Sequence, residues 1–138
     1  MAQFTHDQID KMFPAHEGDR CFSYDPLVEA LGESVVQVSS DDYQGITRIL
    51  LKERVGGRYC LYDYEWGSCS GCDFAQGCST VEEFLEYAND AAESIQWKSV
   101  QEILSELFEM EKGNSTFGHR DEEQYDFVKK CREYLNRI

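Results

Sequence analysis

The spacing of apolar and polar residues changes along the chain, and each spacing predicts a different kind of element. In the N-terminal part, short apolar clusters predict two short helices, one that ends at Pro14 and one that begins at Asp25 and ends near Gly32. The valine-rich residues 35–38 follow, and their β-branched side chains predict a strand.

The middle of the chain predicts a β-hairpin. Residues 46–54 and 59–66 form its two strands, and residues 55–58 form a turn in which paired glycines are able to adopt positive φ. The return strand alternates, so that one of its sides carries Cys60, Tyr62, Tyr64 and Trp66. Together with residues 35–38, the hairpin makes a small antiparallel meander sheet.

From Thr80 onward the apolar residues recur at helical spacing. Thr80 and Glu83 form a plausible capping box, and apolar stripes follow over residues 81–92, 100–108 and 125–138, with a break at residues 113–115. The predicted fold is therefore α+β, with short N-terminal helices, a small antiparallel meander sheet and C-terminal helices packed on it.

The length of 138 residues predicts a single domain that spans residues 1–138. It comprises an acidic N-terminal part (1–45), the hairpin with a cysteine turn (46–79) and a helical part (80–138).

The charge of the chain is strongly negative and unevenly distributed. The 27 acidic residues against 13 basic ones give a net charge of −14. Residues 1–45 and residues 80–112 each carry 9 acidic and 2 basic residues, whereas the rest of the chain is neutral. This balance argues against direct binding to nucleic acid or to an anionic membrane, and it favours basic protein surfaces as partners. No apolar run is long enough to span a bilayer, and no targeting segment is visible, so we expect a cytoplasmic protein.

Cysteines gather where the predicted hairpin ends. Cys69 and Cys72 form a CxxC pair, Cys78 follows, and the return strand contributes Cys60. Such a turn directs two thiolates toward one metal ion, so Cys60, Cys69, Cys72 and Cys78 are the candidate zinc ligands. Asp73 or a distant cysteine or histidine is another choice for the fourth position. Small thiols that pack a tight glycine turn are the alternative, and both interpretations stay open.

Two further patterns concern binding surfaces. The aromatic side of the return strand is typical of a sheet face packed under helices. Next to Arg58 it could instead stack bases, but few further basic residues accompany it and the net charge is −14. The carboxylates of residues 80–112 are hardly offset by basic residues, and their spacing resembles that of phosphates. Those we expect to contact a partner are Glu82, Glu86, Asp90, Glu93, Glu102, Glu106 and Glu109.

Catalytic motifs are missing from the sequence. It contains no phosphate loop, nucleophile elbow, HExxH helix or dinucleotide fingerprint. The histidines His6, His16 and His119 do not pair with a glutamate at the spacing of a di-metal site. We therefore predict a protein without enzymatic activity and without a cofactor other than the possible zinc.

Three short motifs stand out in the middle of the chain: Asp42-Tyr43-Gln44-Gly45, Gly57-Arg58-Tyr59 and the stretch Tyr64–Asp73. With them, the region from Asp42 to about Trp97 resembles a group of small, mostly uncharacterised proteins of bacteriophages and related mobile elements. The specific part of the resemblance is the turn Gly67-Ser68-Cys69-Ser70-Gly71-Cys72-Asp73 that follows the hairpin. The resemblance implies a phage or prophage origin and the cytoplasm of a bacterial host cell, but it implies no activity and no catalytic residues.

These observations together predict an acidic interaction protein of phage type. We expect it to inhibit a host defence complex that handles nucleic acid, such as a CRISPR effector or a restriction system, because its carboxylates would occupy a basic surface of that complex. Two alternatives stay open: a small structural-zinc or thiol-containing domain with an accessory role, and an adaptor that dimerises through its aromatic or helical face.

Overall fold

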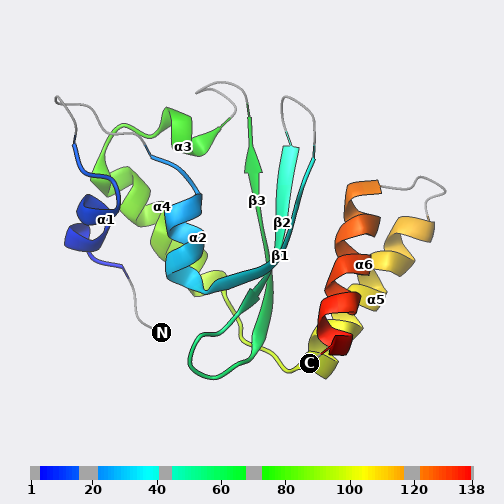
Figure 1. Ribbon diagram of the computed structural model, residues 1–138. Helices are drawn as coiled ribbons and strands as arrows, with labels where there is room; N and C mark the ends of the chain where they lie inside the picture. The colour runs from blue at the N-terminus through cyan, green and yellow to red at the C-terminus, as the bar shows by residue number, and fades with distance from the viewer. Residues whose placement is uncertain (1–3, 16–21, 41–44, 68–72, 117–121, 138) are drawn as a thin grey trace.

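The structure is a computed structural model, and it describes residues 4–15, 22–40, 45–67, 73–116 and 122–137. Figure 1 shows its elements, which are α1 (His6–Met12), α2 (Asp25–Leu31), β1 (Glu33–Ser39), β2 (Gly45–Lys52), β3 (Tyr59–Trp66), α3 (Phe74–Gly77), α4 (Val81–Ser94), α5 (Val100–Thr116) and α6 (Glu122–Arg137). The predicted α+β fold is confirmed, with short helices before a three-stranded antiparallel sheet and, after the one-turn α3, three longer helices among the described residues.

The sheet is a meander in the order β1-β2-β3. β2 and β3 pair without interruption over their full length, as a hairpin with a clean alternation requires. The pairing of β1 with β2 shifts between Ser34 and Val36, where β1 carries a bulge. β1 and β3 are consequently the two edge strands of the described sheet.

Glu53 and Arg58 close the hairpin turn around its two glycines. Gly57 adopts a φ of +71°, a conformation that suits glycine because it has no Cβ. The Glu53 amide donates to the Arg58 carbonyl at 2.7 Å, and the Arg58 guanidinium pairs with the Glu53 carboxylate. Because β2 ends at Lys52, the turn begins at Glu53 and is longer than the predicted turn from Val55.

Helices cover both faces of the sheet. The central strand β2 shows this most clearly, since Ile49, Leu50 and Leu51 are all 0 % exposed although neighbouring residues of a strand point to opposite faces. Leu50 packs with residues of α5 and α6, whereas Ile49 and Leu51 pack with Val28 of α2 and with Ile95. Figure 1 accordingly shows the sheet between two groups of helices, α1–α4 on one side and α5–α6 on the other.

The helices α1 and α4 begin at recognisable capping residues. Thr5 and Gln8 form a capping box at the start of α1, and Thr80 accepts a hydrogen bond from the Glu83 amide at the start of α4. α3 was not predicted. It is a single helical turn whose N-cap is Asp73. Aspartate is a favoured N-cap residue, so its position was the sequence signal for this helix.

The C-terminal helices differ from the prediction in length and in one part of their apolar stripe. α5 continues to Thr116, through the predicted break at residues 113–115, because a glycine inside a helix costs only about 1 kcal/mol relative to alanine. Phe108, expected on the apolar stripe, is 58 % exposed, since the neighbouring Ile103 and Leu107 already fill the contact with the sheet. The predicted stripe of α6 is buried at Val128, Cys131 and Leu135, whereas Tyr125 is exposed.

Candidate functional site

α4 presents an unbroken carboxylate stripe to solvent, and it contains no basic residue. At about 100° of rotation per residue, its acidic side chains fall within one arc of about 100°. The buried side chains Phe84 and Ala88 lie on the opposite side of the helix. The stripe, which we call the α4 carboxylate stripe, consists of the exposed residues Glu82, Glu83, Glu86, Asp90 and Glu93.

The density of charge on this stripe is close to that of one strand of DNA. From Glu82 to Glu93 the helix rises about 16 Å, so one carboxylate occurs about every 4 Å along the axis. A strand of B-DNA carries one phosphate about every 3.4 Å. A groove that fits a phosphate backbone therefore meets a similar row of negative charges on α4.

Helix stability does not explain all of these carboxylates. Glu82 and Glu83 lie in the first turn, where the helix dipole favours negative charge. Asp90 and Glu93 lie in the C-terminal half, where the dipole gives no such benefit. Glu86 also lies four residues from both Glu82 and Asp90, and like charges at this spacing cost a few tenths of a kcal/mol, roughly, per pair.

The first helix extends the acidic surface beyond α4. α1 packs against α4, with the Phe4 amide donating to the Asn89 side chain at 2.7 Å and His6 Nε2 lying 3.2 Å from Glu82 Oε1. Asp7, in the first turn of α1, is exposed. Part of the acidic N-terminal block thus lies next to the α4 carboxylate stripe, a proximity that the sequence alone did not establish.

The predicted carboxylates of α5 are in a different place and have different partners. α5 lies on the other face of the sheet, so Glu102, Glu106 and Glu109 do not continue the row formed by Glu82, Glu86, Asp90 and Glu93 (Figure 1). Glu102 accepts hydrogen bonds from the amide and hydroxyl of Ser99, which hold the pKa of the carboxyl below its ordinary value.

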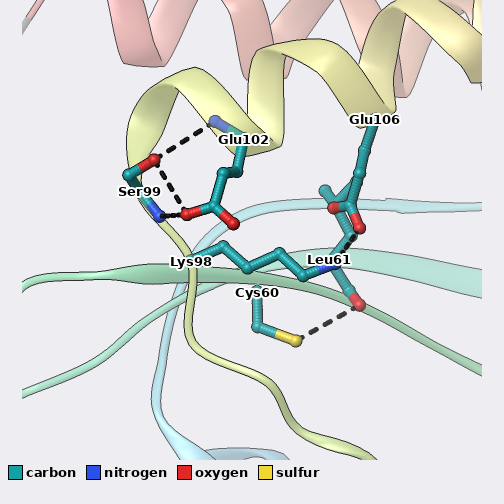
Figure 2. A network of polar contacts seen from close by, with 6 residues as sticks. All are labelled: Cys60, Leu61, Lys98, Ser99, Glu102 and Glu106. Carbon is teal, nitrogen blue, oxygen red and sulfur yellow. Dashed lines mark hydrogen bonds and ion pairs between the residues drawn. The ribbon is translucent and has the colours of Figure 1, made fainter.

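Glu106 forms an ion pair with Lys98, and Figure 2 shows this pair beside β3. Lys98 is held there because it exchanges two main-chain hydrogen bonds with Tyr59, at 2.8 and 2.7 Å. A polar pocket of about 180 Å³ lies next to the pair and is lined by Cys60, Leu61, Ser94, Gln96, Lys98 and Glu106. Among the described contacts, Glu102 and Glu106 have partners within the protein, whereas none is described for Glu109.

The described cysteines of the candidate zinc site are separated in the core. Cys60 packs with Val28, Ile49 and other residues under the sheet, whereas Cys78 packs in the cluster around Phe84. Cys69 and Cys72 lie outside the described residues. Within the described part of the chain, no three histidine, cysteine or acidic side chains form a group able to hold a metal ion. The zinc site at the turn therefore stays a prediction.

The described thiols of Cys60, Cys78 and Cys131 are buried, so we expect them to be poor nucleophiles. Burial raises the pKa of Cys60 and of Cys78, and it raises the pKa of Cys131 to about 12. We expect these three to resist alkylation by iodoacetamide at pH 8 in the folded protein and to react fully in urea. Peptide mapping by mass spectrometry measures this, and rapid native alkylation at Cys131 would contradict the packing described.

Asp73 is a buried polar residue whose structural role the sequence did not identify. The sequence offers it as a metal ligand, but its Oδ1 accepts from the Tyr24 hydroxyl at 2.8 Å and from the Ala75 amide at 3.0 Å. Its Oδ2 accepts from the Gly67 amide at 3.1 Å. Asp73 thus joins the end of β3 to the start of α3 and to Tyr24, and its oxygens are used for structure.

The aromatic side of β3 lies under helices, as the sequence predicted. Tyr62 and Tyr64 are half-buried, and the Tyr64 ring stacks on Tyr24 with centroids 4.4 Å apart. Tyr87 of α4 stacks on Phe74 in the same region, at 4.5 Å. Burial raises the pKa of the Tyr62, Tyr64 and Tyr87 phenols, so these groups stay neutral at physiological pH.

Comparisons with known proteins give this chain no relative: no family model, no curated protein and no solved structure matches it. Among the helices of the described residues, none combines the length and the apolar character that crossing a membrane requires.

Proposed function

We propose that the protein is a non-enzymatic, phage-type interaction protein that binds a basic, nucleic-acid-binding surface of a host protein and blocks it. The observation that carries the proposal is the α4 carboxylate stripe, with five exposed acidic residues and no basic residue on one helix. A host defence complex such as a CRISPR effector or a restriction system has the long basic groove that such a stripe fits.

The mechanism is competition for lysine and arginine side chains. These groups hold phosphates in the groove, and carboxylates at a similar spacing form charge-assisted hydrogen bonds with them. The net charge of −14 speeds the encounter with a basic partner. Salt screens these contacts, so we expect the affinity for the partner to fall steeply as ionic strength rises.

The carboxylates of α4 are better placed for this role than those of α5. Glu102 already accepts a hydrogen bond from Ser99, and Glu106 already forms an ion pair with Lys98. On α4, Glu86 and Asp90 are exposed and remain close to like charges that raise the local negative potential. We therefore assign the main contact to α4, extended by Asp7 of α1.

A charge reversal tests the proposal. The variant Glu82→Lys, Glu86→Lys, Glu93→Lys should lose inhibition of a purified CRISPR effector or restriction enzyme acting on its DNA substrate. We expect the apparent Kd to rise about 100-fold or more, because close interfacial charge pairs are each worth more than 1 kcal/mol, roughly. DNA cleavage in the presence of increasing inhibitor measures the effect.

The matched control reverses three charges on α6, at Glu122, Glu123 and Glu133. Both variants change three negative charges to positive and so raise the net charge from −14 to −8. The control should keep its inhibition within about fivefold. Equal losses in both variants would show that only net charge matters, and full inhibition by the α4 variant would refute the assignment of α4.

A further inference from the structure

Among the described residues, no strand pairs with the outer edge of β3 beyond Tyr59. β3 is an edge strand, and the closing bond from the Glu53 amide to the Arg58 carbonyl fixes which of its residues bond to β2. Because hydrogen-bonded and non-hydrogen-bonded pairs alternate along an antiparallel ladder, the main-chain groups of Leu61, Asp63 and Glu65 point away from β2.

A segment of the same chain already pairs with this edge of β3 at Tyr59. Tyr59 has the same orientation as Leu61, and its outward amide and carbonyl exchange two hydrogen bonds with Lys98 in an antiparallel bridge. Among the described residues the bridge does not continue, since the segment before it enters α4. The Leu61 carbonyl receives only a weak bond from the Cys60 thiol at 3.4 Å, which leaves an acceptor site on that oxygen (Figure 2).

The surface beside this edge is apolar at its floor and acidic at its rim. A depression of about 450 Å³ is lined by Leu61 and Met110 together with Ser105, Glu106 and Glu109. The exposed side chains of Asp63 and Glu65 continue the acidic surface along β3, and Arg48 of β2 is the cross-strand neighbour of Asp63.

We propose that the free edge of β3 from Leu61 to Glu65 binds an extended, lysine- or arginine-containing segment of a partner protein as an additional strand. The outward residues offer about six main-chain donors and acceptors for such a strand. Alternate side chains of the segment lie over Leu61, Asp63 and Glu65. A lysine or arginine opposite Leu61 covers the apolar floor with its methylene groups and places its charge at Glu109.

A second copy of this chain is a poor occupant of the edge. Two β3 edges that paired would bring Asp63 and Glu65 of one molecule beside the same residues of the other, and like charges across a strand pair are destabilising. A basic strand gains attraction at the same positions. Lys98 shows the complementarity within the chain, because it pairs with the edge at Tyr59 and places its ammonium on Glu106.

This site is separate from the α4 carboxylate stripe, so one can fail while the other holds. The probe is an octapeptide of alternating lysine and valine with blocked termini, added to the ¹⁵N-labelled protein. We expect chemical-shift changes and slower hydrogen exchange at the amides of Leu61, Asp63 and Glu65, with a Kd below about 1 mM. In an antiparallel pair a lysine opposite Leu61 turns its own amide toward the edge, so the same peptide with N-methylated lysines should bind at least tenfold more weakly. N-methylated valines test the other register.

Two variants separate main-chain pairing from charge. Asp63→Pro removes the outward amide while leaving the ladder with β2 intact, since proline is tolerated where the amide faces away from the sheet. Asp63→Ala removes the same charge but keeps the amide. We expect at least tenfold weaker peptide binding for proline than for alanine, and circular dichroism checks that both variants are folded.

Three results would overturn the proposal. One is the absence of amide shifts on β3 at about 1 mM peptide. Another is binding that shifts only α4 residues such as Glu86 and is insensitive to N-methylation at either set of positions, which would reveal plain charge attraction. The third is a concentration-dependent dimer whose Leu61 and Asp63 amides are already protected without peptide. If Asp63→Pro does not fold, the N-methylated peptides still decide the question.

Discussion

Replacing Phe84 by alanine is expected to lower the free energy of unfolding by about 3–5 kcal/mol, which is a large part of the stability of a domain of this size. Phe84 is 0 % exposed, and its ring contacts Phe13 and Phe22 with centroids 4.9 and 5.2 Å away. These residues belong to the N-terminal segment, so the lost ring leaves a cavity where α1 meets α4. Urea unfolding followed by circular dichroism measures the loss.

The exposed Phe108 provides a matched control for this prediction. Phe108→Ala should change the free energy of unfolding by less than about 0.5 kcal/mol, because the side chain is 58 % exposed. In the Phe84→Ala variant, the amide of Ile9 in α1 should also exchange faster with solvent than in the parent. Similar destabilisation by the two substitutions would be inconsistent with the core described here.

Much of the fold was predictable because the spacing of apolar residues shows which side of a helix or strand is buried. The switch from alternation at Tyr62 and Tyr64 to helical spacing after Thr80 placed β3 and α4 correctly. The layering was not predicted, although the consecutive apolar residues Ile49, Leu50 and Leu51 are the pattern of a strand buried on both faces. That pattern shows that both faces are covered, but it does not show which helix covers which face.

The candidate site was only partly predictable for a related reason. The spacing of Glu82, Glu86 and Glu93 already places them on one side of a helix, and the structure shows them exposed. The partner of Glu106 was not visible in the sequence, because Lys98 reaches it through a bridge to Tyr59, a residue distant in the chain. Residues on two helices form one surface only if the helices lie on the same layer, and this depends on long-range packing.

Asp73 is the second position at which one substitution should have a large effect. Asp73→Ala is expected to lower the free energy of unfolding by about 2–4 kcal/mol. The change removes the N-cap of α3 and leaves the buried Tyr24 hydroxyl and the Gly67 amide without their acceptor. Urea unfolding at pH 7 measures it. The control Asp90→Ala, at an exposed aspartate of α4, should cost less than about 0.5 kcal/mol.

The pH dependence of stability separates the contribution of the Asp73 charge from that of the side chain's shape. Burial alone would raise the pKa of this carboxyl, but the hydrogen bonds from Gly67, Tyr24 and the first amides of α3 together hold it below its ordinary value of 3.8. A carboxyl whose pKa is lower in the folded state stabilises the protein above its unfolded pKa, and this contribution is lost as pH falls through the folded value. The stability difference between the parent and Asp73→Asn should therefore be constant from pH 7 to about pH 5 and shrink below about pH 4. A difference that stayed unchanged down to pH 2 would mean that the ionised carboxylate contributes nothing, and that Asp73 acts only through its shape and its neutral hydrogen bonds.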